Sequence, residues 1–256
     1  MIRTNACLSL VLVASCSLPT HVARKTIDLQ LPIAGVQTID CESHNGAITI
    51  VGDAAATTIS LHTEIEVRAF SPSDASALLV QTSVDQNVVD GRLVVRGKYP
   101  EPLGGRIVTF SYTLRVPPAL GATLLSHNGG LDVRGIEGDL GLVTHNGGIA
   151  VVSRARRVDA TPHNGEITIG RDGEGDFAGS IESPNGAITV ELAPGVRTTV
   201  DASTHNGRLA WPADALDVRR EDSTLSCRFG DGAGHLAIVT HNGDVNLRGA
   251  ATPSKN

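Results

Sequence analysis

The pair Asn-Gly recurs seven times in this chain of 256 residues, and its spacing constrains the fold more than any other feature. The intervals between successive Asn residues are 83, 18, 18, 21, 21 and 36. A segment of 18 to 21 residues holds two short strands and two turns, so this spacing predicts one unit repeated along an axis. The predicted structural corners of these units are Asn45, Gly46, Asn128, Gly129, Asn146, Gly147, Asn164, Gly165, Asn185, Gly186, Asn206, Gly207, Asn242 and Gly243.

The residues after each corner alternate between apolar and small or polar types. The third residue after each Asn is Ile, Leu or Val, and the fifth is apolar in all seven units, with Trp211 as the largest. The residues between them include Thr49 and Asn246. Such alternation is typical of a strand with one buried face. One unit cannot bury that face alone, so we expect units to stack about 4.8 Å apart as an all-β solenoid with coils of 18–21 residues.

The interval of 36 residues, twice 18, predicts a degenerate coil between Asn206 and Asn242. Cys227 and Phe229 occupy the third and fifth places after Thr224, so this coil is expected to stack in register. The competing fold is a sandwich of Asn-Gly hairpins, whereas the fixed spacing and matching apolar columns favour the solenoid. Both corner residues tolerate a positive φ, and Asn side chains in stacked coils are placed to hydrogen-bond with one another.

The composition indicates an aliphatic core and excludes nucleic acid as a partner. Hydrophobic residues make up 41% of the chain but aromatic residues only 3%. The formal net charge is −6, and no basic run lies beside aromatic residues, so a nucleic-acid groove has no electrostatic basis.

The region before Asn128 is less regular, and Pro117-Pro118 marks its junction with the regular coils. We expect one short helix near 73–82, capped by Ser73. The other predicted elements are strands at 57–68 and 106–116 and a hairpin of Val84–Val89 with Arg92–Gly97 around Asp90-Gly91.

We expect the N-terminal residues to be a processing signal. Arg3 precedes an apolar run that is much shorter than the ~20 residues needed to cross a bilayer. The run ends in Val13-Ala14-Ser15-Cys16, which resembles the lipobox of bacterial lipoproteins, and the alternative is an ordinary secretory signal. We expect Cys16 to carry the lipid that anchors the protein in the cell envelope, with Ser17 favouring the outer membrane. The predicted parts are a signal at 1–15, a tether and first strand at 16–35, an irregular β part at 36–122, regular coils at 123–249 and a frayed tail at 250–256.

The recurring unit Thr/Ser-His-Asn-Gly-x-aliphatic-x-aliphatic follows a part that closes with Leu114-Arg115-Val116-Pro117. This pattern, over about residues 36–249, resembles the bacterial "putative adhesin" family of β-strand-repeat proteins. The resemblance implies a surface that binds or scaffolds a protein or glycan, and it brings no catalytic residue and no cofactor. His before Asn departs from the family's general pattern, so no role for histidine is carried over.

A histidine precedes the corner Asn in six units, and Pro184 takes its place in the seventh. Alternation places this position outward, so the rings should form an exposed column. Neighbouring imidazoles can tilt to share Zn²⁺ or Cu²⁺, which makes His127, His145 and His163 a candidate ligand site. The interruption by Pro184 and the lack of a recurring acid favour a polar repeat residue without metal. The six histidines are His44, His127, His145, His163, His205 and His241.

An alternative function is a carbohydrate-active β-helix enzyme, which needs acids and bases clustered on neighbouring coils. The acids of this chain are scattered, and the densest group, from Asp172 to Asp176, has Phe177 and Ser183 where a calcium loop needs Gly and Glu. We expect that group to be a solvated turn. Ser126 and His127 are sequence neighbours on opposite strand faces, which prevents general-base contact between them. We therefore expect no enzyme activity and no catalytic residue.

Two cysteines besides Cys16 follow the signal. Cys41 and Cys227 lie many coils apart, more than ~24 Å in a straight stack. Because a disulfide needs Cα atoms within about 7 Å, we expect two free, buried thiols.

Overall fold

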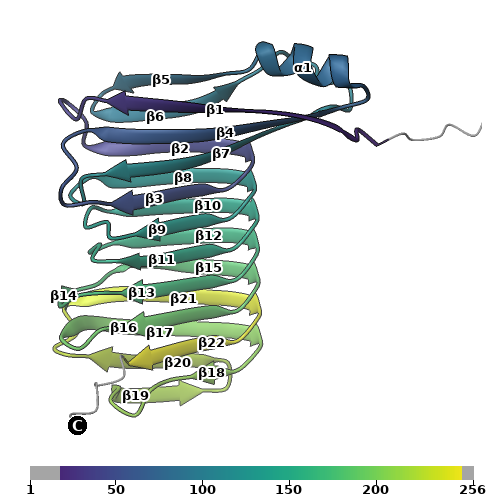
Figure 1. Cartoon of the computed structure of the whole chain (residues 1–256). Coiled ribbons are helices and arrows are strands. Elements are labelled where there is room, and N and C mark those ends of the chain that lie inside the picture. Colours follow the sequence, from purple (N-terminus) through teal and green to yellow (C-terminus); the bar gives the residue numbers. More distant parts are fainter. Residues whose placement is uncertain (1–17, 250–256) are drawn as a thin grey trace, which may run out of the picture.

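The computed structural model describes residues 18–249 as two large mixed β-sheets and one short helix (Figure 1). The predicted signal, Cys16 and the predicted tail at 250–256 lie outside the described residues. The prediction of an all-β protein with a single helix is confirmed for residues 18–249. The elements are β1 (His21–Leu31), β2 (Thr38–Asn45), β3 (Ile48–Gly52), β4 (Ile59–Ala69), α1 (Pro72–Val80), β5 (Ser83–Val89), β6 (Arg92–Lys98), β7 (Ile107–Val116), β8 (Gly121–Asn128), β9 (Leu131–Arg134), β10 (Leu140–Asn146), β11 (Ile149–Ser153), β12 (Val158–Asn164), β13 (Ile167–Arg171), β14 (Gly175–Asp176), β15 (Gly179–Asn185), β16 (Ile188–Leu192), β17 (Val196–Asn206), β18 (Leu209–Ala210), β19 (Leu216–Glu221), β20 (Thr224–Phe229), β21 (Gly234–Asn242) and β22 (Val245–Gly249).

Each Asn-Gly unit supplies one strand to each sheet. The strand that ends at Asn lies in the 12-stranded sheet, and the strand that begins three residues later lies in the 10-stranded sheet. Corresponding strands of neighbouring units pair in parallel, so Leu140 pairs with Val158 and Asn146 with Asn164. Figure 1 shows the result as two rows of strands along the length of the molecule. The two strands of a unit do not pair with each other, so the corners are not hairpin turns.

The core lies between the two sheets and is mainly aliphatic. The third residue after the corner Asn is buried in all seven units, and the fifth is buried in six. Trp211, the exception, is partly buried against the core. In β11 the alternation places Ile149 and Val151 inside and Ala150 outside. Burying one such aliphatic side chain contributes about 1.5–3 kcal/mol, so the in-register columns supply the main driving force for stacking.

The C-terminal units do not follow chain order. Strand β21 pairs in parallel with β15 on one side and β17 on the other, so the Asn242 unit lies between those of Asn185 and Asn206. The prediction that Cys227 and Phe229 belong to a further coil in register is wrong, because β20 pairs antiparallel with both β17 and β19. Apolar alternation decides which face of a strand is buried but not its direction, and both residues are buried in the antiparallel arrangement as well.

Strand β1, which precedes the Asn45 unit, and the segment between the Asn45 and Asn128 units form the other end of the molecule. Strands β1, β4 and β7 pair antiparallel in one sheet, and β5 and β6 end the other sheet as a hairpin. Strand β2 pairs directly with β8, so the Asn45 and Asn128 units are neighbours despite their separation in sequence. The predicted strands at 57–68 and 106–116 and the predicted hairpin are confirmed, apart from one- or two-residue shifts at their ends.

The N-cap of the helix lies two residues before the predicted one. Ser71, rather than Ser73, is the N-cap, and its Oγ accepts a hydrogen bond from the Asp74 backbone N–H over 3.2 Å. Pro72 follows at the first helical position, where its fixed φ and missing N–H cost nothing. Ala75 and Leu78 are the buried residues of the helix.

Both cysteines of the described part are buried and free, as predicted. Within residues 18–249 no helix has the length and apolar content that spanning a bilayer requires.

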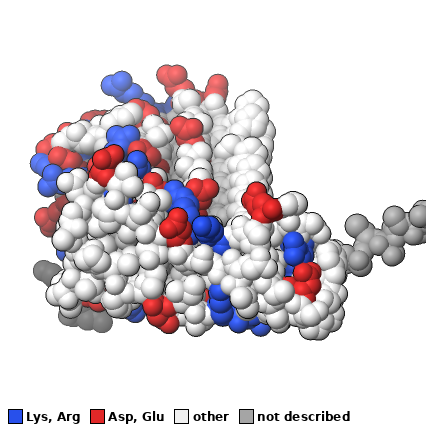
Figure 2. Space-filling model, turned by 90° about the horizontal axis from the view of Figure 1, so that it is seen from above, with Lys and Arg blue, Asp and Glu red and all other residues white. Residues whose placement is uncertain are grey.

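Seen from above, charged side chains of both signs cover one part of the surface, and an uncharged, ridged part lies beside it (Figure 2).

Candidate binding surface at the Asn-Gly corners

The seven corner asparagines are joined by side-chain hydrogen bonds in one unbroken series. The Nδ2 of Asn146 donates to the Oδ1 of Asn128 over 3.0 Å, and the other five bonds measure 2.9–3.2 Å. At one end of the series, the Nδ2 of Asn45 donates to the Val108 carbonyl. In space the order is Asn45, Asn128, Asn146, Asn164, Asn185, Asn242 and Asn206.

The glycine after each Asn is required by close approach between units. A Cβ at Gly165 would lie 2.1 Å from the carbonyl oxygen of Gly147, and one at Gly147 would lie 2.3 Å from that of Gly129. Backbone atoms cannot yield to such contacts, so no side chain fits. The tolerance of both corner residues for a positive φ is used at Gly46, where φ is 127°, whereas the corner asparagines and the other six corner glycines adopt no positive φ.

The residue two positions before each Asn points inward, and its role was missed by sequence reasoning. The Thr144 hydroxyl is buried and donates to the Gly129 carbonyl over 2.9 Å. Pro162 holds this position in one unit and has no hydroxyl to donate. The sequence does contain a signal for this role, because Ser or Thr occupies this position in six of the seven units. The other donors are Ser43, Ser126, Ser183, Thr204 and Thr240.

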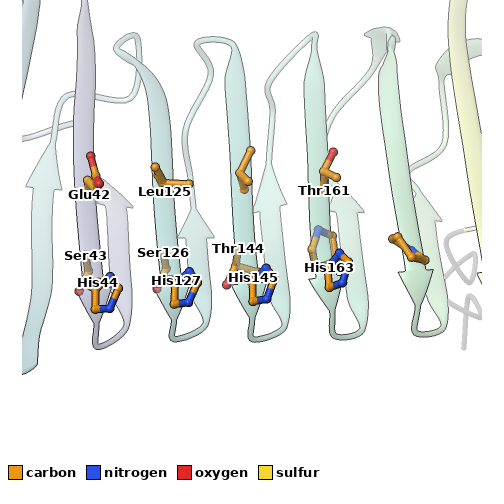
Figure 3. A pocket seen from close by; sticks show the side chains of 13 residues that line it. Glu42, Ser43, His44, Leu125, Ser126, His127, Thr144, His145, Thr161 and His163 are labelled. Carbon is orange, nitrogen blue, oxygen red and sulfur yellow. The ribbon is translucent and has the colours of Figure 1, made fainter. Parts of the chain in front are cut away.

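The histidines before the corner asparagines are exposed and stacked face to face (Figure 3). The ring centroids of His44 and His127 lie 4.9 Å apart, those of His127 and His145 4.8 Å, and those of His145 and His163 4.7 Å. Pro184 follows, and beyond it the rings of His205 and His241 stack at 4.7 Å. This pitch is the spacing of paired strands, so the register of the sheet sets the ring stacking.

As placed, the rings do not chelate a metal ion. Two nitrogens on one Zn²⁺ lie at most about 4.2 Å apart, twice the Zn–N bond length. The stacked centroids of His127, His145 and His163 are farther apart than that, and the rings are parallel within 4°. Residues 18–249 hold no group of three or more His, Cys, Asp or Glu side chains arranged to bind a metal.

A shallow groove of about 380 Å³ runs beside the histidine column across β2, β8, β10 and β12. The second row of side chains along it is Glu42, Leu125, Val143 and Thr161. Figure 3 labels Glu42, Leu125 and Thr161 on the same strands as the rings. Leu125 and Val143 are 41% and 46% exposed, and they pair on neighbouring strands, so they give the groove a small apolar patch. Glu42 is the one carboxylate of the lining, and it is paired with Arg96 at 2.9 Å.

Most of the carboxylates that form ion pairs elsewhere on the described surface do so with arginines. Asp132 binds Arg134, and Asp244 binds Arg208, whose guanidinium holds the pKa of Asp244 below its usual range. Asp28 and Asp201 pair instead with His62 and His235. The predicted solvated turn from Asp172 to Asp176 is partly a strand, because β14 pairs with the start of β17.

Comparison with known proteins finds no matching protein-family model and no matching curated protein. Among solved structures, the chain is similar to a "putative cell adhesion protein" from Clostridium sporogenes, with 11% identity over 89% of this chain and 100% of the other and a TM-score of 0.49. It is also similar to a "putative adhesin" from Bacteroides fragilis (12%, covering 90% and 99%, TM-score 0.41) and a "putative lipid binding protein" from Parabacteroides distasonis (8%, covering 90% and 95%, TM-score 0.27). The first two descriptions coincide with the family that the repeat resembles. At such low identity the function has to come from this chain's own residues.

Proposed function

We propose that this protein is a non-enzymatic, lipid-anchored component of the bacterial cell envelope that binds an uncharged glycan chain along the histidine-lined groove. The observation that carries the proposal is the groove itself, in which each of four neighbouring units repeats one exposed imidazole next to one outward side chain. A binding surface with a constant repeat suits a ligand with a constant repeat.

The proposal treats the stack as a β-solenoid. In-register parallel pairing, the series of Asn hydrogen bonds and the single shared core support this description. A solenoid presents extended surfaces along its axis, and each surface repeats the chemistry of one position of the unit.

The chemistry of the groove favours a neutral glycan over an anionic one. The exposed edge of an imidazole both donates and accepts hydrogen bonds, which suits sugar hydroxyls. Leu125 and Val143 provide apolar contact for the C–H faces of sugar rings. The one carboxylate, Glu42, is already paired with Arg96, so the groove has little net charge to attract an anion.

Anchoring is proposed from the lipobox alone. The apolar run and the small residues before Cys16 support lipid attachment at that thiol, and Ser17 supports sorting to the outer membrane. Replacing Cys16 with Ala should move the protein from the membrane fraction to the soluble fraction and abolish labelling by radioactive palmitate. Labelling that persists in the Cys16→Ala protein would contradict the anchor without touching the groove.

The binding role can be tested by affinity electrophoresis of the purified protein in gels that contain neutral or acidic polysaccharides. We expect retardation by a neutral polysaccharide, and Val143→Ser should weaken it several-fold because an apolar contact is lost. The matched control is Val152→Ser, which changes a valine of similar exposure on the outer face of the other sheet.

Three results would contradict the proposal. They are retardation by acidic polysaccharides only, equal effects of the two valine substitutions, and saturable binding of an extended peptide in place of any glycan. Shortening of the bound polysaccharide over time would replace the binding role with the alternative of a carbohydrate-active enzyme.

A further inference from the structure

A second hollow, of about 630 Å³, lies at the end of the strands opposite the Asn-Gly corners. Here the second strand of one unit leads into the first strand of the next, as in the connections from β11 to β12 and from β13 to β15. The hollow is independent of the histidine groove and shares no residue with it. Its lining consists of Ala119, Glu137, Arg154, Arg156, Arg171, Gly173 and Glu174.

Arg171, the last residue of β13, is only 5% exposed. Its Nη2 donates to the Glu174 carbonyl over 3.0 Å, but its Nε and Nη1 have no hydrogen-bond partner. An arginine side chain stays charged in proteins, so this is a buried cation with two donors left unused. A buried charged group with unsatisfied donors destabilises the folded protein unless an acceptor binds to those donors.

Two more arginines face the same hollow without a carboxylate partner. Within residues 18–249, Arg154 and Arg156 take part in no ion pair, and the Nε of Arg154 donates only to the Asp172 carbonyl. Arginines at neighbouring positions differ in this respect: Arg157 is paired with Asp159 at 2.7 Å.

The charges around Arg171 are also mainly positive. Burial is the main cause that lowers the pKa of Arg171, and the Arg154 and Arg156 guanidinium groups lower it further, while Asp172 opposes them. Glu137 and Glu174 line the hollow, but neither forms an ion pair with the three arginines. Gly173, with φ of 147°, leaves open the space beside Arg171, where a Cβ would lie 3.0 Å from Nη1.

We propose that this hollow binds a tetrahedral oxyanion, a phosphate or sulfate group, through Arg154, Arg156 and Arg171. Guanidinium groups donate pairs of N–H bonds that match two oxygens of one anion. A tetrahedral anion offers oxygens in several directions, so it can accept from three arginines at once, whereas a planar carboxylate is satisfied by one or two. Arg171 would supply the buried contact, and the two exposed arginines would complete the shell.

The test is titration of the purified protein with inorganic phosphate and with sulfate, at constant ionic strength set by chloride, followed by calorimetry and by 31P line broadening for phosphate. We expect saturable binding to one site and a rise in Tm with anion concentration. Arg156→Gln, at an exposed position, should weaken the affinity about tenfold or more, the loss typical of a charge-assisted hydrogen bond. Arg171→Gln should abolish binding, and Arg156→Gln keeps the test valid if that variant does not fold.

Arg157→Gln is the matched control, because it removes a neighbouring arginine that already has a carboxylate partner. Equal weakening by Arg157→Gln and Arg156→Gln, or no saturable binding of either anion, would overturn the proposal. Vesicles that contain phosphatidylglycerol separate the two sources of phosphate. Retention on them that Arg156→Gln removes indicates a lipid headgroup, and binding of inorganic phosphate without retention indicates a soluble ligand.

Discussion

The buried hydroxyls behind the corners are the most sharply testable feature of this fold. Thr144 is 1% exposed, and its hydroxyl donates to the carbonyl of Gly129 in the neighbouring unit over 2.9 Å. In Thr144→Val a methyl group replaces the hydroxyl at nearly the same volume, so the core changes little. What changes is that the Gly129 carbonyl loses its side-chain donor inside the protein.

The expected cost follows from that single loss. The Thr144 hydroxyl is buried and Gly129 is partly buried, and leaving such an acceptor without its partner costs about 1–3 kcal/mol. In a protein of this size 1 kcal/mol lowers Tm by about 2–4 °C, so Thr144→Val should melt roughly 2–12 °C below the wild type. The chain contains its own reverse experiment, because Pro162 occupies the same position without a hydroxyl. Pro162→Thr should provide a hydroxyl donor for the Gly147 carbonyl. This new hydrogen bond should offset part of the stability that is lost because threonine restricts the unfolded chain less than proline does.

The assay is urea unfolding followed by far-ultraviolet circular dichroism, with Tm from the same signal. The matched control is Thr161→Val, which makes the same chemical change at an exposed position of β12. It should alter stability by no more than about 0.5 kcal/mol. If Thr144→Val and Thr161→Val gave equal stabilities, the hydroxyls would have no structural role and the reasoning would fail.

Three further predictions concern other parts of the molecule. Gly165→Ala should cost more than Thr144→Val in the same urea assay, because its Cβ would lie 2.1 Å from a backbone oxygen that cannot move alone; an unchanged midpoint would contradict the close approach. The hydrogen bond that the partly exposed His62 donates to the Asp28 carboxylate raises the pKa of His62, so the NMR titration of His62 should have a midpoint above the usual histidine value, and Asp28→Asn should lower that midpoint. The small stabilisation from this pair should be present at acidic pH and fade as pH rises through the midpoint. Burial raises the pKa of the Cys41 and Cys227 thiols, that of Cys227 to about 11, so a maleimide reagent at neutral pH should label neither of these two residues until the protein unfolds; rapid labelling of either one in the native protein would refute its burial.

Sequence reasoning succeeds here where a one-dimensional pattern determines the structure directly. The alternation after each Asn predicts which residues are buried, because a strand has a period of two and only one face meets the core. Ile149 and Val151 point inward and Ala150 outward for that reason. The outward position of the histidines follows from the same periodicity, since His145 stands one residue after the buried Thr144.

The same reasoning fails where the structure depends on which strand is whose neighbour. Nothing in the pattern distinguishes a unit stacked in chain order from one inserted between two others, so the position of the Asn242 unit was not predictable. The hollow lined by Arg171 was missed for a different reason. Arg154 and Arg171 occupy nearly equivalent places in consecutive units, so the repeat places them near each other, but the burial of Arg171 and its lack of an acceptor depend on the conformation of the connections between units.

The insertion of the Asn242 unit also bears on how the molecule ends. If the units followed chain order, a long parallel strand of a regular coil would be left unpaired at the C-terminal end, and such edges invite other chains to pair with them. Instead, the 10-stranded sheet ends in β18, which has two residues, and the 12-stranded sheet ends in β19. Every residue of β19 is exposed, the register with β20 shifts between Leu216 and Arg219, and the strand carries Asp217, Arg220 and Glu221. Short, irregular and charged edge strands discourage the pairing of one sheet edge with another. Because the Asn242 unit lies inside the stack, the C-terminal end exposes such strands and not a regular parallel strand to which another chain could pair.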